Sequence, residues 1–155
     1  MKPNYVIIPL ITIAVAVVGS FITSGGMAWY RSITLPSWTP PGSVIGTVWT
    51  VLFILATISA LIVWNGAPHD ARLRWIIAIF LLNAVLNIGW SLLFFGAHQM
   101  GAAVWEAGVL GLTVVALVIF IWPLSTLAAL LLVPYAGWVA FATYLTYSVW
   151  RLNLL

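Results

Sequence analysis

The stretch Ser43–Trp64, SVIGTVWTVLFILATISALIVW, contains no charged residue and is long enough to cross a membrane. A membrane helix needs about 20 mostly apolar residues. Four further stretches meet this condition, at residues 5–23, 74–95, 101–121 and 125–150. Barrel strands would alternate over roughly 10 residues, and these runs are too continuous for that. The sequence therefore predicts an all-α membrane protein, a single bundle of five transmembrane helices over residues 1–155, with a structured loop at residues 24–42.

The composition supports the same class. The chain is 65% hydrophobic and 5% charged, whereas an ordinary soluble domain carries roughly a quarter charged residues. We therefore expect a multi-pass integral membrane protein with the lipid bilayer as its solvent. The net charge of +3 comes from too few and too scattered residues to predict a nucleic-acid partner. Because the chain has no cysteine, disulfides and cysteine metal sites are excluded.

The N-terminal run and the loop charges bear on topology. The first apolar run continues unbroken through Ile22, so we expect a retained helix rather than a cleaved secretory signal. The basic residues Lys2, Arg72 and Arg74 fall on one side of the predicted bundle. Arg31 and Arg151 fall on the other side. The positive-inside rule favours the N-terminus inside by one charge only, so the sequence leaves the orientation open.

Asparagines inside the third span are candidate functional residues, because polar groups in lipid are costly. Asn83 and Asn87 share a helical face that Trp90 and Ser91 continue. We expect Asn83 to join helices by hydrogen bonds. For Asn87, helix joining and the lining of a cavity both remain open.

Glu106 is the only acidic residue inside a predicted span. An ionised carboxylate is not stable unpaired in hydrocarbon, so this group must be protonated, partnered or close to a wet cavity. Two interpretations remain open: a hydrated side chain at the membrane interface, and a cavity acid facing the bundle.

Aromatic stripes run along the second and fifth spans. The second carries Trp49 and Phe53, and the fifth carries Tyr135, Trp138, Ala142 and Leu145 at helical spacing. Tryptophans at mid-depth with few charges suit a flat apolar ligand. No catalytic triad, carboxylate pair or phosphate-binding loop appears in the sequence, and the two histidines lack metal-ligand spacing. The sequence therefore predicts no catalytic residues, no metal and no cofactor.

The segment Trp29–Gly42, WYRSITLPSWTPPG, is unusually stiff and aromatic for a loop. Its three prolines fix the backbone and bias the preceding residues toward extended shapes. We interpret it as a preformed lid on an apolar cavity. The alternative is an anchor at the membrane interface.

These motifs resemble the translocator protein family, also called tryptophan-rich sensory proteins or peripheral benzodiazepine receptors (TspO/MBR). The resemblance extends over nearly the whole chain. Its elements are the WY and LPSWTPP motifs of the first loop, Trp49, Asn87 with Trp90 and FFGAHQMG, Glu106, and PYAGWVAFATYLTY. The chain departs from the family pattern at Leu35, where a lysine is frequent, and at Glu106, where an aspartate is also common.

The resemblance implies a ligand cavity that opens toward the first loop. Family members bind porphyrins, sterols and benzodiazepine-type ligands, and they commonly form homodimers. The family's ligand contacts match Tyr30, Pro40, Trp49, Asn87, Ser91, Trp138 and Ala142. Trp38, Phe53, Trp90 and Leu145 complete the predicted ligand-binding set. The family's sterol motif matches Leu145, Tyr147 and Arg151.

Three functions are compatible with these expectations. The first is a receptor or carrier for porphyrins or other flat hydrophobic molecules, with a sensory or transport role. The second is an enzyme that degrades porphyrin with light and oxygen, in which Trp49 and Trp138 would react with the porphyrin or shield it. The third is a structural membrane protein that regulates a partner.

Overall fold

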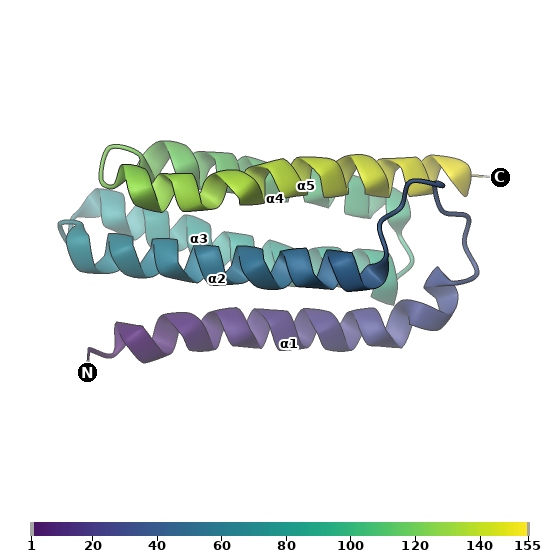
Figure 1. Cartoon of the computed structure of the whole chain (residues 1–155), viewed down its shortest axis with the longest axis horizontal. Helices are drawn as coiled ribbons and strands as arrows, with labels where there is room; N and C mark the ends of the chain where they lie inside the picture. Colours follow the sequence, from purple (N-terminus) through teal and green to yellow (C-terminus); the bar gives the residue numbers. More distant parts are fainter. Residues whose placement is uncertain (1, 155) are drawn as a thin grey trace.

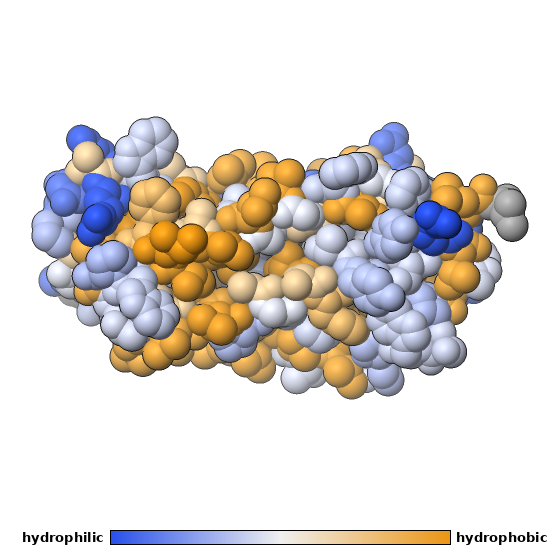
Figure 2. All heavy atoms as spheres, turned by 90° about the horizontal axis from the view of Figure 1, so that it is seen from above, coloured by the Kyte–Doolittle hydropathy of each residue, from blue (hydrophilic) through white to orange (hydrophobic). Residues whose placement is uncertain are grey.

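Five long helices lie side by side in the computed structural model, which describes residues 2–154 (Figure 1). They are α1 (Asn4–Tyr30), α2 (Gly42–Gly66), α3 (Ala71–Ser91), α4 (Met100–Ile121) and α5 (Thr126–Leu152), and a short π-helix η1 (Leu92–Gly96) continues α3. The predicted all-α bundle of five helices is confirmed. Each helix, with η1 counted as part of α3, is long and apolar enough to cross a membrane. Figure 2 shows strongly hydrophilic residues near the two ends and a largely hydrophobic middle, as expected for a multi-pass integral membrane protein.

The first helix is longer than predicted, and the loop is correspondingly shorter. Helix α1 continues through Ser24, Gly25 and Gly26 to Tyr30, so the loop prediction was wrong over residues 24–30. The glycine at position 26 serves close packing rather than chain reversal, because a Cβ there would lie 2.5 Å from the carbonyl oxygen of Phe95. Trp29 and Tyr30 consequently belong to the last turn of α1.

Local signals explain where other helices begin and end. The Asp70 carboxylate accepts a hydrogen bond from the Leu73 amide at the start of α3, and the Ser125 hydroxyl accepts one from the Ala128 amide at the start of α5. The C-terminal end of the third span is a π-turn, in which the Ala97 amide donates to the Leu92 carbonyl at 2.7 Å. Such turns are rare and frequently occur at functional sites.

The core is formed mainly by α2, α3, α4 and α5. Val114, Leu117, Ile121 and Leu132 are fully buried there. Helix α1 lies outside this core against α2 and α3 (Figure 1), and its buried residues are Asn4, Val15 and Gly26. The least buried helix therefore forms one wall of the space described next.

Candidate ligand-binding site

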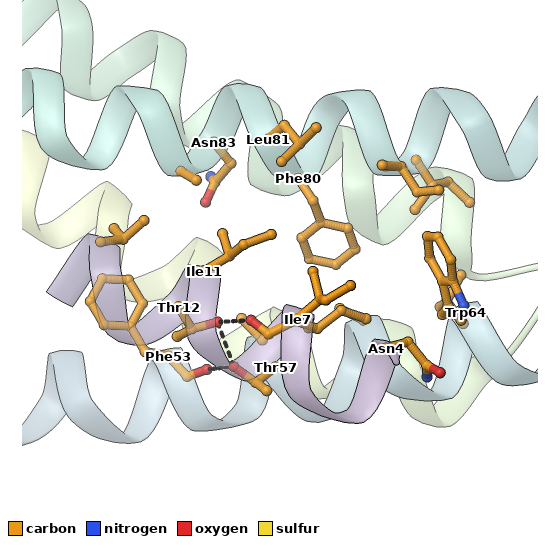
Figure 3. A pocket seen from close by; sticks show the side chains of 18 of the residues that line it. Asn4, Ile7, Ile11, Thr12, Phe53, Thr57, Trp64, Phe80, Leu81 and Asn83 are labelled. Atoms are coloured by element: carbon orange, nitrogen blue, oxygen red, sulfur yellow. Dashed lines mark hydrogen bonds between the residues drawn. The ribbon is translucent and has the colours of Figure 1, made fainter. Parts of the chain in front are cut away.

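A cavity of about 420 Å³ lies between α1, α2 and α3 (Figure 3). Tyr135 of α5, which is buried, forms part of its inner wall. Its lining is almost entirely apolar. The lining residues are Pro3, Asn4, Ile7, Ile8, Ile11, Thr12 and Val15 of the α1 segment, Phe53, Ala56, Thr57, Ala60, Val63 and Trp64 of α2, Leu73, Ile76, Ile77, Phe80, Leu81, Asn83, Ala84 and Asn87 of α3, and Tyr135. Ligand pockets are typically apolar spaces of this size that carry a few fixed polar groups.

The inner wall carries an ordered chain of hydrogen bonds. The Asn87 amide donates to the Tyr135 hydroxyl at 2.6 Å, and that hydroxyl donates to Asn83 Oδ1 at 2.9 Å. The Asn83 amide donates to the Thr113 hydroxyl at 2.9 Å, which donates to the Leu110 carbonyl at 2.7 Å. Both asparagines therefore connect α3 to its neighbours, and both also border the cavity. Because every donor has an acceptor, this polar group is fixed in position.

Two threonines form a polar contact between helices in the middle of the cavity. The hydroxyls of Thr12 and Thr57 are 2.8 Å apart and join α1 to α2. Figure 3 shows this pair between Phe53 on one side and Asn4 and Trp64 on the other, with Asn83 across the cavity from Thr12. The cavity thus runs along α1 instead of across the bundle.

The predicted tryptophans of α2 and α5 lie outside this lining. Trp49 meets Tyr135 edge-on at 5.9 Å and Phe53 at 5.5 Å, so it packs directly behind the cavity wall. Trp138 packs on Phe141 at 5.2 Å, and its indole nitrogen is buried without a hydrogen-bond partner among the residues described. Of the predicted ligand-binding set, Phe53 and Asn87 border the cavity directly.

A second group of predicted residues surrounds η1. Tyr30 contacts Phe95 at 5.5 Å, and Trp90 stacks on Phe94 at 5.1 Å. Leu145 packs against the same residues. We call Trp29, Tyr30, Trp90, Phe94 and Phe95 the π-turn cluster. It attaches the end of α1 to the end of α3.

Three more predicted residues have modest contacts. Ser91 is buried and donates to the Asn87 carbonyl at 3.4 Å. Ala142 is half-buried, and its carbonyl accepts a hydrogen bond from Thr146. Pro40 is half-buried in the first loop. None of the three borders the cavity, and their ligand contacts stay predictions.

The loop after α1 is docked on α5. The Thr34 amide donates to Asn153 Oδ1 at 2.9 Å, and the Asn153 amide donates to the Thr34 carbonyl at 2.8 Å. Trp38 stacks on Tyr144 at 5.6 Å and meets Phe141 at 6.0 Å. The loop therefore packs against the bundle, with its contacts concentrated on one helix.

The sterol motif does not converge on one surface. Tyr147 and Arg151 line an open cleft between the first loop and α5, where Arg151 Nη1 donates to the Tyr147 hydroxyl at 3.4 Å. Leu145 instead packs against the π-turn cluster. Residues two positions apart point to opposite sides of a helix, which accounts for this separation.

Glu106 faces α3. Its Oε1 lies 3.6 Å from the position that a Cβ on Gly89 would occupy. Both carboxyl oxygens are buried without a hydrogen-bond partner in the described part of the chain. This position favours the interpretation of an acid directed at the bundle over that of a hydrated interfacial side chain.

Sequence reasoning missed most of the cavity lining, including every lining residue of α1. Asn4 precedes the first predicted span, and nothing in the sequence pattern indicates that it is buried. Thr113 looks like an ordinary residue of the fourth span in the sequence. In the structure, the orientation of α4 places its hydroxyl against the Asn83 amide. An interior hydroxyl in a span was the one available signal for Thr113.

Comparison with known proteins gives matches along the whole chain. A family model described as the TspO/MBR family matches residues 6–151. The Tryptophan-rich protein TspO of Bacillus cereus is 34% identical over 99% of this chain and 99% of its own. The protein of that name from Archaeoglobus fulgidus is 36% identical over 93% of each chain. The Translocator protein of Homo sapiens is 36% identical over 88% of this chain and 82% of its own.

Proposed function

The chain belongs to the TspO/MBR family, and from this premise we propose that it is a membrane receptor or carrier that binds porphyrins or other flat hydrophobic molecules inside its helix bundle. Sterol-like and benzodiazepine-type compounds are the other candidate ligands. The observation that carries the proposal is the inner end of the cavity, which Phe53 and the hydrogen-bonded pair of Asn87 and Tyr135 border. There an apolar wall adjoins a fixed polar group, the combination typical of small-molecule sites.

Aromatic packing supports a flat ligand at this end. Phe53 and Tyr135 border the cavity, and Trp49 stands edge-on to Tyr135 and next to Phe53 behind the wall, so it supports both rings. Aromatic pairs favour offset-stacked or edge-to-face contacts and contribute about 0.5–1.5 kcal/mol beyond area burial. A planar macrocycle against Phe53 would gain such contacts, while Asn87 would orient its polar substituents.

The transport part of the proposal rests on the relatives. Proteins similar to this chain bear the names Translocator protein and Tryptophan-rich protein TspO. A cavity that borders the lipid phase suits a carrier, because a hydrophobic ligand would then pass between bilayer and protein without crossing water.

Tryptophan fluorescence of the detergent-solubilised protein tests the proposal. Protoporphyrin, haem and a sterol are titrated separately, and quenching reports binding because Trp49 lies directly behind the cavity wall. We expect Phe53→Ala to weaken protoporphyrin binding about tenfold, which corresponds to about 1.4 kcal/mol. The matched control is Phe21→Ala, whose side chain is 80% exposed to lipid. Equal affinities in wild type, Phe53→Ala and Asn87→Leu would overturn the site.

A further inference from the structure

We propose that the cavity binds an anionic acyl lipid, with the lipid carbonyl at Asn4 and the chain running along α1. The ligand chemistry is a long alkyl chain that ends in an acyl oxygen beside a negative charge. This inference goes beyond the proposed function, because it assigns an occupant to the cavity when no porphyrin is bound.

The first observation is an unused hydrogen-bond donor. Asn4 is 6% exposed and borders the cavity, and its amide nitrogen is buried without a partner in residues 2–154. Buried polar groups in native proteins are almost always paired, so an exception indicates a missing acceptor. The terminal torsion of asparagine is soft, and rotation about it turns the amide toward an acceptor inside the cavity.

The second observation is the length of the space. Cavity-lining residues of α1 extend from Asn4 to Val15, which is about 16 Å at 1.5 Å per residue. The hydrocarbon core of a bilayer is about 30 Å thick, so one leaflet is about 15 Å deep. The cavity therefore matches the depth of one leaflet, with Asn4 at the end of the helix where lipid carbonyls lie.

The third observation is where the cavity opens. Ile7 and Ile11 of α1 and Leu81 of α3 line it and are also exposed. These side chains mark an opening between α1 and α3 at the lipid-facing surface. A chain from the surrounding leaflet can enter there sideways without leaving the hydrocarbon phase.

The fourth observation is the charge beside the mouth. Pro3 and Leu73 line the cavity, and their chain neighbours Lys2, Arg72 and Arg74 are exposed. The nearby Asp70 carboxylate accepts a hydrogen bond from the Leu73 backbone amide at the start of α3. Figure 2 shows strongly hydrophilic residues gathered at the end of the molecule where α1 begins. Basic residues next to a span attract anionic lipid head groups, and hence the occupant is anionic.

Photolabelling with two diazirine-bearing probes tests the proposal and separates the lipid sources. One probe is a long-chain fatty acid and the other is phosphatidylglycerol with a labelled acyl chain. We expect adducts at Ile7, Ile11 or Leu81, at least fivefold less labelling in Asn4→Leu, and unchanged labelling in Asn65→Leu. Asn65 is an exposed asparagine at the same end of the bundle, so it is a matched control. Labelling by one probe identifies the source, and labelling by both supports a site for acyl chains of either kind.

Two results would overturn the site. One is equal labelling of wild type and Asn4→Leu, and the other is adducts spread evenly over lipid-facing residues such as Phe21 and Leu112. A second variant keeps the test independent of folding at Asn4. In Arg72→Gln/Arg74→Gln, where both side chains are exposed, we expect the preference for phosphatidylglycerol over labelled phosphatidylcholine to fall at least threefold. An unchanged preference would contradict the anionic part of the proposal.

Discussion

Gly26 of α1 lies directly against the backbone of Phe95 in the π-turn. A Cβ at position 26 would stand 2.5 Å from the Phe95 carbonyl oxygen and 3.0 Å from its Cα. Since backbone atoms cannot move away as a flexible side chain can, only glycine fits at this crossing. The contact fixes the C-terminal end of α1 beside the π-turn cluster.

Gly26→Ala should destabilise the protein by about 1–3 kcal/mol, the usual cost of forcing an extra methyl group into a packed site. Thermal unfolding in detergent measures the effect. Gly25→Ala is the control, because a Cβ at position 25 meets nothing within 4 Å. If both variants have the same unfolding temperature, the close approach of α1 and η1 does not contribute to the stability of the protein.

Tyr135→Phe should destabilise the bundle by about 1–2 kcal/mol. The substitution removes the two hydrogen bonds of the Tyr135 hydroxyl, while the Asn87 amide keeps its bonds to the Asn83 carbonyl at 2.9 Å and to Asn83 Oδ1 at 3.2 Å. Each lost hydrogen bond costs about 0.5–1.5 kcal/mol in water-soluble proteins and less between membrane helices. Chemical unfolding in mixed micelles measures the change. Tyr144→Phe on the same helix, with a 61% exposed side chain, should be close to neutral.

Asn153→Ala should release the first loop without unfolding the helices. The variant removes both hydrogen bonds to Thr34, and the stack of Trp38 on Tyr144 is then the main contact of the loop with α5. Hydrogen exchange at the Thr34 amide should quicken at least tenfold, and proteolysis within residues 31–41 should become faster. Unaltered exchange would mean that the aromatic stack alone holds the loop.

Illumination separates a carrier from a photoenzyme. We expect bound protoporphyrin to decay no faster with the protein than in a detergent blank, because binding is the proposed activity. The measurement is porphyrin absorbance over time, with product analysis. A defined product formed over many turnovers, and lost in Trp49→Phe or Trp138→Phe at saturating porphyrin, would show enzymatic photodegradation instead.

Sequence patterns predict the helices well because lipid leaves the backbone few choices. A long apolar run in a bilayer must be helical, so the number and type of elements follow from hydropathy. The predicted end of the first helix was wrong because Ser24, Gly25 and Gly26 are residues typical of a loop. In fact the tertiary contact with Phe95 requires glycine there, and a single sequence does not show which helix will press against it.

The candidate site was predictable only in part, for a related reason. Spacing placed Asn83 and Asn87 on one face of α3, and that face does border the cavity. The hydrogen-bond partners of the two asparagines depend on how α4 and α5 are rotated about their axes. Tyr135 and Thr113 therefore could not be assigned as partners from the sequence. Asn4 gave no signal, since its burial arises from the position of α1 against the bundle.

Helix α1 is attached to the bundle more firmly at its C-terminal end than at its N-terminal end. It packs closely at Gly26 and the π-turn cluster and shares a hydrogen bond with α2 where Thr12 meets Thr57. At its other end, the Asn4 side-chain amide has no hydrogen-bond partner among residues 2–154. Contacts are therefore tighter toward the C-terminal end of α1, so the width of the cavity should fluctuate more beside Asn4, at the N-terminal tip, than beside Val15. Lateral pressure in the bilayer acts on that tip, and the mechanical state of the membrane therefore becomes a variable in how much room the protein offers its ligands.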